Sequence, residues 1–341
     1  MIGRRTLLGG VCALPARTAL AQGQWQYRPT GVVHRELRFP GAAGVTLAGT
    51  LTLPLTTEIQ RVPGVVMIAG SGPTDRDGNN PLIPVRVDLL KQLAELLARA
   101  GIASLRYDKR GLGASTPAPR DSLQSMERFT AWNLFVEDAR AAHAELLRHD
   151  EIKSYATAFL GHSEGGLLAL AATAEMGKSG PYALVLAGTP GLPLHALLRA
   201  QIERSAPQLV AAAERVMDVA IGTGHVPLNV PKALQPDFPS YLGPFLQGAL
   251  TFDPAKTAAS LDAVCLLLQG GADTQVVPMR DVQPLVDALA RRNKPAEVLV
   301  VPNVSHNLKP VTGPDDPGFA GPVAQPIASK LTSWLSRVLG A

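Results

Sequence analysis

Cysteine is scarce in this chain of 341 residues, which contains only Cys12 and Cys265. A small scaffold held together by disulfides is therefore excluded, because such scaffolds depend on dense cysteine pairs. No long polar or low-complexity tract occurs, which argues against extensive disorder. Aromatic residues make up 5% of the chain, and no basic cluster has aromatics interleaved with it, so nucleic-acid binding has little support.

The chain opens with the pattern of a cleavable export signal over residues 1–21. An arginine pair (Arg4–Arg5) precedes a short apolar run, and Ala19–Ala21 offers small residues for cleavage. The paired arginines indicate the twin-arginine route, so we expect a periplasmic or secreted protein. A membrane anchor is disfavoured because Pro15 and Arg17 stop the apolar run well short of the ~20 residues that span a bilayer.

Cleavage of that segment would change both the charge and the thiol content. Residues 1–21 contain three arginines and no acidic residue, so the formal net charge of +4 would fall to +1. Cys12 would be lost, and Cys265 would remain as a lone thiol that cannot form an internal disulfide. Because Cys265 lies in an apolar run, we expect it to be a buried small hydrophobe.

Short apolar runs rich in β-branched residues alternate with segments of helical periodicity along most of the chain. The expected strands are Gly64–Gly70, Ala103–Asp108, Thr157–Gly161, Ala183–Gly188, Val264–Gln269 and Glu297–Val301. Residues 85–100 and 135–146 have helical spacing, and residues 33–53 look like an antiparallel hairpin. This order predicts an α/β fold with a mostly parallel central sheet flanked by helices, which would occupy residues 22–341 as one domain.

One long stretch, from about residue 189 to residue 260, interrupts the alternation. It contains amphipathic helical segments such as Leu194–Arg204 and Ala206–Ile221, but no convincing strand. A simple crossover would be shorter. We expect a helical cap over the active site; the alternative is a long crossover that packs elsewhere.

The segment Gly161–Gly165 reads Gly-His-Ser-Glu-Gly and matches the G-x-S-x-G pattern of a serine nucleophile. It directly follows an expected strand and precedes the helical run 167–176, which is the context that this motif requires. The flanking glycines relieve crowding in a sharp turn, and the helix N-terminus favours the developing negative charge. These features predict that Ser163 is the nucleophile.

A nucleophilic serine needs a base and an acid that orients the base, in the chain order Ser, Asp, His. Asp273 and His306 each follow one of the last two expected strands, so both should reach the same sheet edge as Ser163. Asp281 is less suitable because it lies in the following helix. The remaining histidine after a strand, His162, should point its side chain away from the serine.

The oxyanion hole requires two backbone N–H groups, one of them from the residue after the nucleophile. Glu164 supplies that one. The second should come from the turn after the first expected strand of the parallel sheet, where Pro73 has no N–H, so Ser71 is the first choice and Gly72 the reserve.

Two charged turns invite other interpretations. The acidic run 75–79 resembles a calcium loop, but Gly78 stands at its fourth position and Arg86 where a bidentate glutamate is needed. The run 108–113 lacks both the spacing of a dinucleotide motif and a Walker lysine. We therefore expect structural turns, no metal and no cofactor.

Three motifs together resemble the α/β-hydrolase superfamily, and within it bacterial carboxylesterases of the dienelactone-hydrolase-like and EstD types. They are Gly70–Asn79, Arg106–Gly111 and Gly161–Gly166, and the likeness extends over most of residues 30–340. Dienelactone hydrolases proper use a cysteine nucleophile, so the serine of this chain puts lactone opening in doubt.

The resemblance implies hydrolysis of small esters, often with short acyl chains, by Ser163, Asp273 and His306. One alternative is a serine aminopeptidase or acylpeptide-type hydrolase, although no anchor for a charged peptide terminus is visible. Another is a non-catalytic periplasmic binding protein on the same fold, which an intact triad disfavours.

Overall fold

The computed structural model describes residues 31–55, 60–294, 296–313 and 315–341. Its centre is an eight-stranded sheet in the order β1-β2-β4-β3-β5-β6-β7-β8, in which β2 is antiparallel to β1 and β4 and the other neighbours are parallel. The strands are β1 (Val32–Pro40), β2 (Thr46–Pro54), β3 (Val62–Ile68), β4 (Ala103–Tyr107), β5 (Ile152–His162), β6 (Ala183–Ala187), β7 (Val264–Gly270) and β8 (Ala296–Val301). The predicted hairpin and mostly parallel sheet are confirmed, while the predicted signal lies outside the described residues.

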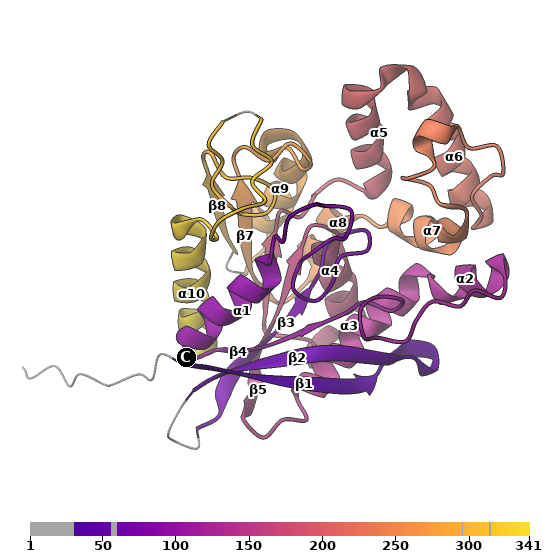
Figure 1. Ribbon diagram of the computed structural model, residues 1–341. Coiled ribbons are helices and arrows are strands. Elements are labelled where there is room, and N and C mark those ends of the chain that lie inside the picture. The colour runs from indigo at the N-terminus through magenta and orange to yellow at the C-terminus, as the bar shows by residue number, and fades with distance from the viewer. Residues whose placement is uncertain (1–30, 56–59, 295, 314) are drawn as a thin grey trace, which may run out of the picture.

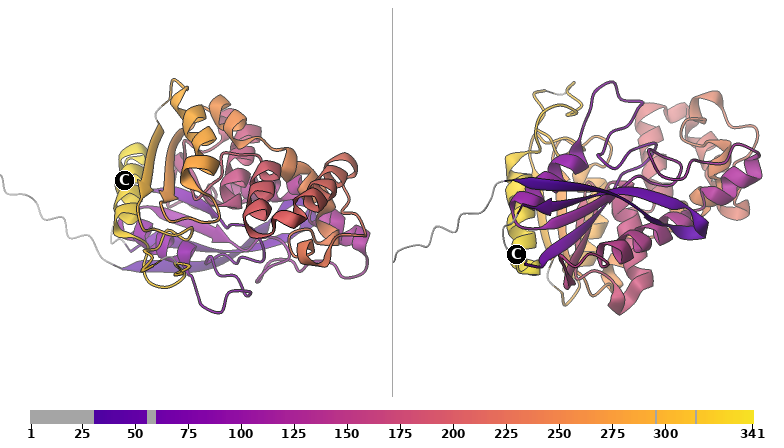
Figure 2. Two further views of the ribbon diagram at one scale, coloured as in Figure 1. Left: turned by 90° about the horizontal axis from the view of Figure 1, so that it is seen from above. Right: turned by 60° about the horizontal axis from the view of Figure 1, so that its bottom comes forward.

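Helices cover both faces of the sheet (Figures 1 and 2). The main ones are α1 (Leu89–Arg99), α2 (Leu123–Phe129), α3 (Trp132–Leu146), α4 (Glu164–Met176), α8 (Pro254–Ser260), α9 (Gln283–Ala290) and α10 (Gln325–Leu339). One hydrophobic cluster joins the sheet to α3, α4, α8 and α9, and a second joins the opposite face to α1 and α10. The strands that lie between the two clusters are buried on both sides, as their continuous apolar runs predict.

A group of helices between β6 and β7 forms a lobe beside this body (Figure 1). It comprises α5 (Leu194–Ser205), α6 (Val210–Thr223) and α7 (Gly243–Thr251), joined by short 3₁₀ turns, and we call residues 194–251 the helical insertion. The insertion has its own hydrophobic core, which includes Met217 and Phe238. The helix α8 packs against α4 and α9 instead, so the lobe ends before it.

Most expected element boundaries lie within a few residues of the observed ones. The largest differences are in β5, which begins five residues earlier than predicted, and in α1 and α6, which each begin four residues later. The side-chain oxygen of Asn79 accepts the N–H groups of Val87 and Asp88 and so stabilises the loop conformation just before α1. No helix in the described ranges has the length and apolar content to span a membrane.

Candidate active site

Ser163 lies in the tight turn between β5 and α4, at the carboxyl edge of the sheet. Its backbone has φ 55° and ψ −122°, a conformation that residues other than glycine rarely adopt. A strained backbone conformation of this kind persists only where the surrounding structure enforces it. In a turn between a strand and a helix, it makes the serine side chain project from the apex of the turn. The turn therefore has the geometry that the sequence motif predicts.

The glycines of the motif allow three backbone segments to approach one another. A Cβ atom at Gly165 would lie 2.2 Å from the carbonyl oxygen of Ile68 in β3, and one at Gly161 would lie 2.2 Å from that of Gly165. Both separations are far below contact distance and involve backbone atoms. Only glycine fits either position, so the start of α4 can press directly on β3.

The Asp273 carboxylate and the His306 imidazole form a buried pair on the loops after β7 and β8. Nδ1 of His306 lies 2.7 Å from Oδ2 of Asp273, which also accepts from the side-chain amide of Gln269 at 2.9 Å. Oδ1 accepts the N–H groups of Gln275 and Val276. Burial acts to raise the pKa of Asp273, but the imidazole and these donors lower it overall, so the group is an anion.

This anion determines how the imidazole is protonated. A carboxylate can only accept, so Nδ1 of His306 carries the proton. The other ring nitrogen, Nε2, has no hydrogen-bond partner among the described residues. It can therefore take a proton from an alcohol, the task of a general base.

Ser163 and His306 line the same cavity, which has a volume of about 140 Å³. The cavity is lined by Gly70, Ser71, Thr74, Gly78, Asn80, Ile83, Val87, His162, Ser163, Gln275, His306, Asn307 and Phe319. No acidic side chain is among these lining residues. The structure thus brings the predicted nucleophile and base to one polar pocket, with Asp273 behind the base.

The predicted oxyanion donors come from two segments, the loop after β3 and the first residue of α4. Ser71 lines the cavity, Gly72 follows it with φ 71°, and Glu164 is the first residue of α4. No hydrogen bond of the described residues uses the N–H group of Ser71, Gly72 or Glu164. All three remain available to a substrate oxygen.

His162 has a role that the sequence did not indicate. Its ring lies beside that of His306, with centroids 4.8 Å apart, and its Nε2 donates to the backbone oxygen of His306 at 2.9 Å. Burial, followed by the neighbouring His306, lowers the pKa of His162 to about 3, so this imidazole stays neutral. It holds the base from the strand side and lines the same cavity as Ser163.

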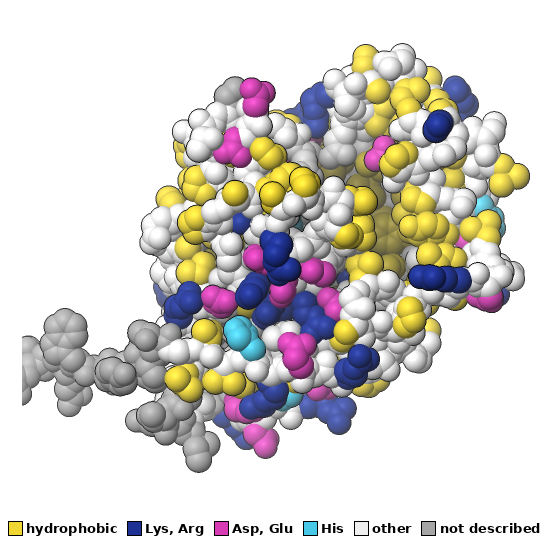
Figure 3. All heavy atoms as spheres, viewed as in Figure 1, with side chains coloured by type: hydrophobic (Ala, Val, Ile, Leu, Met, Phe, Trp, Pro, Cys, Tyr) yellow, Lys and Arg dark blue, Asp and Glu magenta, His cyan; other side chains and the backbone are white. Residues whose placement is uncertain are grey.

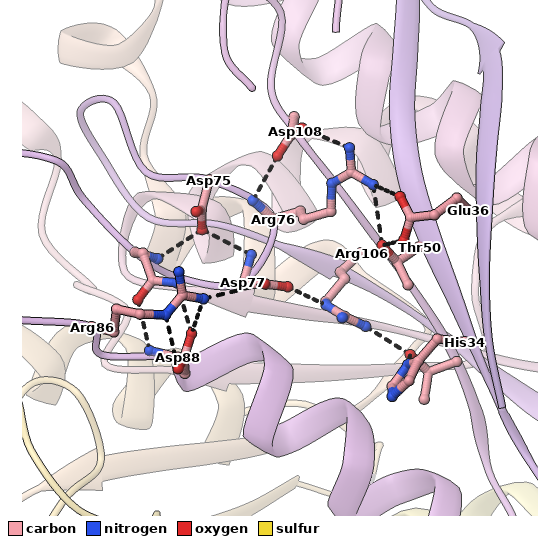
Figure 4. A network of polar contacts seen from close by, with 12 residues as sticks. His34, Glu36, Thr50, Asp75, Arg76, Asp77, Arg86, Asp88, Arg106 and Asp108 are labelled. Atoms are coloured by element: carbon pink, nitrogen blue, oxygen red, sulfur yellow. Dashed lines mark hydrogen bonds and ion pairs between the residues drawn. The ribbon is translucent and has the colours of Figure 1, made fainter. Parts of the chain in front are cut away.

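The loop that carries Ser71 is fixed to the sheet by a network of charged groups (Figure 4). The backbone and guanidinium of Arg76 both bond the carboxylate of Asp108, and the same guanidinium reaches Glu36 in β1 at 2.7 Å. Arg106 in β4 bonds Asp77 at 2.8 Å. These contacts agree with the prediction that both charged turns are structural.

The acidic groups of the same loop are engaged with protein donors. The Asp75 carboxylate accepts the N–H groups of Asp77 and Asn79, and Asp88 is bonded by Arg86 (Figure 4). In the part of the chain that the structure describes, no three potential ligand side chains converge to hold a metal ion.

The helical insertion is tied to the body on two sides. In α5, Gln201 donates to the backbone oxygen of Gln275, which lines the catalytic cavity. On the other side, His225 bonds Glu127 of α2 at 2.9 Å. Figure 3 shows a hollow between this lobe and the body, with hydrophobic side chains gathered on its walls.

Comparison with known proteins supports the class of the fold. A family model described as serine aminopeptidase, S33, matches residues 86–240, a range that includes Ser163 but neither Asp273 nor His306. A search of curated proteins found no sequence match. Among solved structures, a puromycin-hydrolysing peptidase of Mycobacterium tuberculosis is 20% identical over 91% of this chain, with a TM-score of 0.61. This chain has the α/β-hydrolase fold.

Other structural neighbours are similar in size to this chain. An esterase of Pyrococcus furiosus is 14% identical over 93% of this chain and 94% of its own, with a TM-score of 0.57. Est1E of Butyrivibrio proteoclasticus, solved with ferulic acid, is 15% identical over 88% of this chain and 96% of its own, with a TM-score of 0.54. This chain spans only 40% of the M. tuberculosis peptidase. The likeness to these structures shows the fold, and the family model adds a match over residues 86–240 alone.

Proposed function

We propose that this hydrolase is a carboxylesterase that cleaves small, short-chain esters through Ser163, His306 and Asp273. The observation that carries the proposal is the shared pocket: the strained serine and the oriented imidazole both line it. His306 takes the proton of Ser163, the serine oxygen attacks the ester carbonyl, and the alcohol leaves with that proton. Water then releases the acid from the acyl-enzyme by the same steps.

The pocket favours an ester over a peptide with a free amino terminus. An aminopeptidase must pair the terminal ammonium with an anion, and none of the lining side chains is acidic. The family description and the puromycin-hydrolysing neighbour favour the second candidate, a serine peptidase. The two candidates differ in the bond cleaved rather than in the triad.

The surrounding parts fit the same proposal. The helical insertion acts as the predicted cap, because α5 is bonded to the loop that follows the acid, and the apolar hollow beside it receives the acyl or alcohol group. The opening 21 residues direct the enzyme to the periplasm or the medium, where a twin-arginine signal would send it.

The proposal is tested with Ser163→Ala and p-nitrophenyl esters of increasing chain length, assayed beside an aminoacyl p-nitroanilide. We expect kcat to fall by roughly 10⁴- to 10⁶-fold in the variant, because the step that forms the acyl-enzyme is lost. Ser179→Ala is a matched control, since Ser179 lies just beyond the other end of α4 and bonds only a local carbonyl.

Labelling with a fluorophosphonate separates an enzyme from a silent binding protein on this fold. We expect covalent labelling of wild type and of Ser179→Ala, and none of Ser163→Ala. A preference for the anilide over every ester would favour the peptidase. Unchanged turnover in Ser163→Ala would refute the assignment of Ser163 as the nucleophile.

A further inference from the structure

Lys109 is a buried cation with no part in the proposed triad. It lies two residues after the end of β4, and only 4% of its surface is exposed. Its ammonium donates to the backbone oxygen of Gly70 at 2.6 Å and reaches a carboxylate oxygen of Glu164 at 3.4 Å. Burial of an ammonium group is costly unless its donors are paired, so these two contacts anchor its position.

The first contact acts on the peptide that carries an oxyanion donor. The carbonyl of Gly70 and the N–H of Ser71 belong to one planar peptide group, and no described peptide bond is cis. In a trans peptide the two bonds point in opposite directions. When Lys109 holds the carbonyl oxygen, it therefore fixes the N–H on the far side, and it also polarises the amide into a stronger donor.

The second contact reaches the other donor residue. Glu164 offers its backbone N–H at the start of α4, while its side chain is the carboxylate beside Lys109. One ammonium thus connects the loop after β3 with the first turn of α4. These segments are far apart in sequence, yet they supply the two N–H groups on which the proposed mechanism depends.

We propose that Lys109 is a positioning residue for the oxyanion hole, which aligns the N–H groups of Ser71 and Glu164 through the Gly70 carbonyl and the Glu164 carboxylate. This inference rests on the proposed function, since it concerns the stabilisation of a tetrahedral oxyanion. If Lys109 only neutralised Glu164, its loss would lower stability and leave the chemical step unchanged.

The test uses Lys109→Met, which keeps an unbranched apolar chain as long as the lysine stem and removes the ammonium. We expect kcat for p-nitrophenyl acetate to fall roughly 10- to 100-fold with KM within about twofold, somewhat less than the loss of an entire oxyanion donor. The affinity for a trifluoromethyl ketone, which forms an oxyanion on the serine, should fall by the same factor. The affinity for the matching methyl carbinol, which forms none, should not change.

Arg292→Met is the matched control. Arg292 also donates to backbone carbonyls, those of Ala258, Leu261 and Ala263, but at the opposite edge of the sheet. We expect it to lower the melting temperature with kcat and the ketone affinity unchanged. Glu164→Gln, which weakens the second contact alone, should lower both quantities by a smaller factor.

Folded Lys109→Met with wild-type kcat, or with reduced kcat but unchanged ketone affinity, would overturn the inference. If Lys109→Met does not fold, the same two measurements on Glu164→Gln decide it, and no loss there is equally fatal. Fluorophosphonate labelling of the wild-type serine keeps the two proposals apart. A labelled enzyme with insensitive variants refutes the role of Lys109 and leaves the esterase intact.

Discussion

Replacing Asp273 by asparagine removes the negative charge beside His306 and keeps the shape of the side chain. In the proposed mechanism His306 becomes a cation when it takes the proton of Ser163, and Asp273 then stabilises that cation across a contact of 2.7 Å. The charge centres of such a pair are about 4 Å apart, and at an effective dielectric constant of about 20 their attraction is about 4 kcal/mol. Since about 1.4 kcal/mol is a factor of ten in rate, kcat/KM should fall about 10³-fold.

The hydrogen bonds around Asp273 make the substitution costly in another way. All four partners of the carboxylate donate: His306, Gln269, and the N–H groups of Gln275 and Val276. An asparagine must turn its NH₂ group toward either pair. If it faces the imidazole, Nδ1 must accept and the proton moves to Nε2, so the base can no longer accept from the serine.

The assay is single-turnover hydrolysis of p-nitrophenyl acetate, with folding checked by thermal unfolding. Asp281→Asn is the control, because Asp281 is also a fully buried carboxylate near the end of the same loop and bonds Arg280 rather than a histidine. We expect kcat/KM of the control within about threefold of wild type. An Asp273→Asn enzyme within tenfold of wild type, or an equal loss in the control, would refute the assignment of the acid.

Two further predictions concern stability. Gly165→Ala should lower the melting temperature by roughly 10 °C or prevent folding, because its Cβ would overlap the carbonyl oxygen of Ile68. Gly222→Ala, whose Cβ would meet nothing within 4 Å, should be neutral or stabilising. Thermal unfolding of the two variants tests this difference. Burial lowers the pKa of His143 from 6.5 to about 4, so the unfolded chain binds a proton first and the free energy of unfolding should fall by about 3 kcal/mol between pH 6.5 and pH 4. His143→Gln, which can still bond Thr157, should flatten that part of a urea-unfolding pH profile, and an unchanged slope would contradict the cause.

The sheet and the catalytic turn could be predicted from sequence because their signals are local. Continuous apolar runs mark the buried strands, and the glycines of Gly161–Gly165 mark a turn whose close contacts no other residue permits. Asp273 and His306 follow β7 and β8, and the parallel arrangement of these strands places both residues at the sheet edge that carries Ser163. These features need no knowledge of which distant residues meet.

The roles of His162 and Lys109 could not be predicted in this way. His162 bonds the backbone of a residue 144 positions away, and Lys109 bonds a carbonyl 39 positions before it. Both partners are backbone carbonyl oxygens, which every residue has. The residue type at the partner position therefore does not reveal the contact. The extent of the helical insertion was also hidden, because the membership of α8 in the body depends on packing against α4 and α9 rather than on its own pattern.

The helical insertion has a hydrophobic core of its own, so its packing is largely independent of the sheet body. Changes at Met217 or Phe238 are felt among the helices of residues 194–251, while the turn at Ser163 rests on contacts within the sheet body. Substitutions can therefore accumulate in the helical insertion without altering the contacts that hold the turn at Ser163. For the proposed esterase, a change of ester preference is best sought in these helices, with the strands kept unchanged.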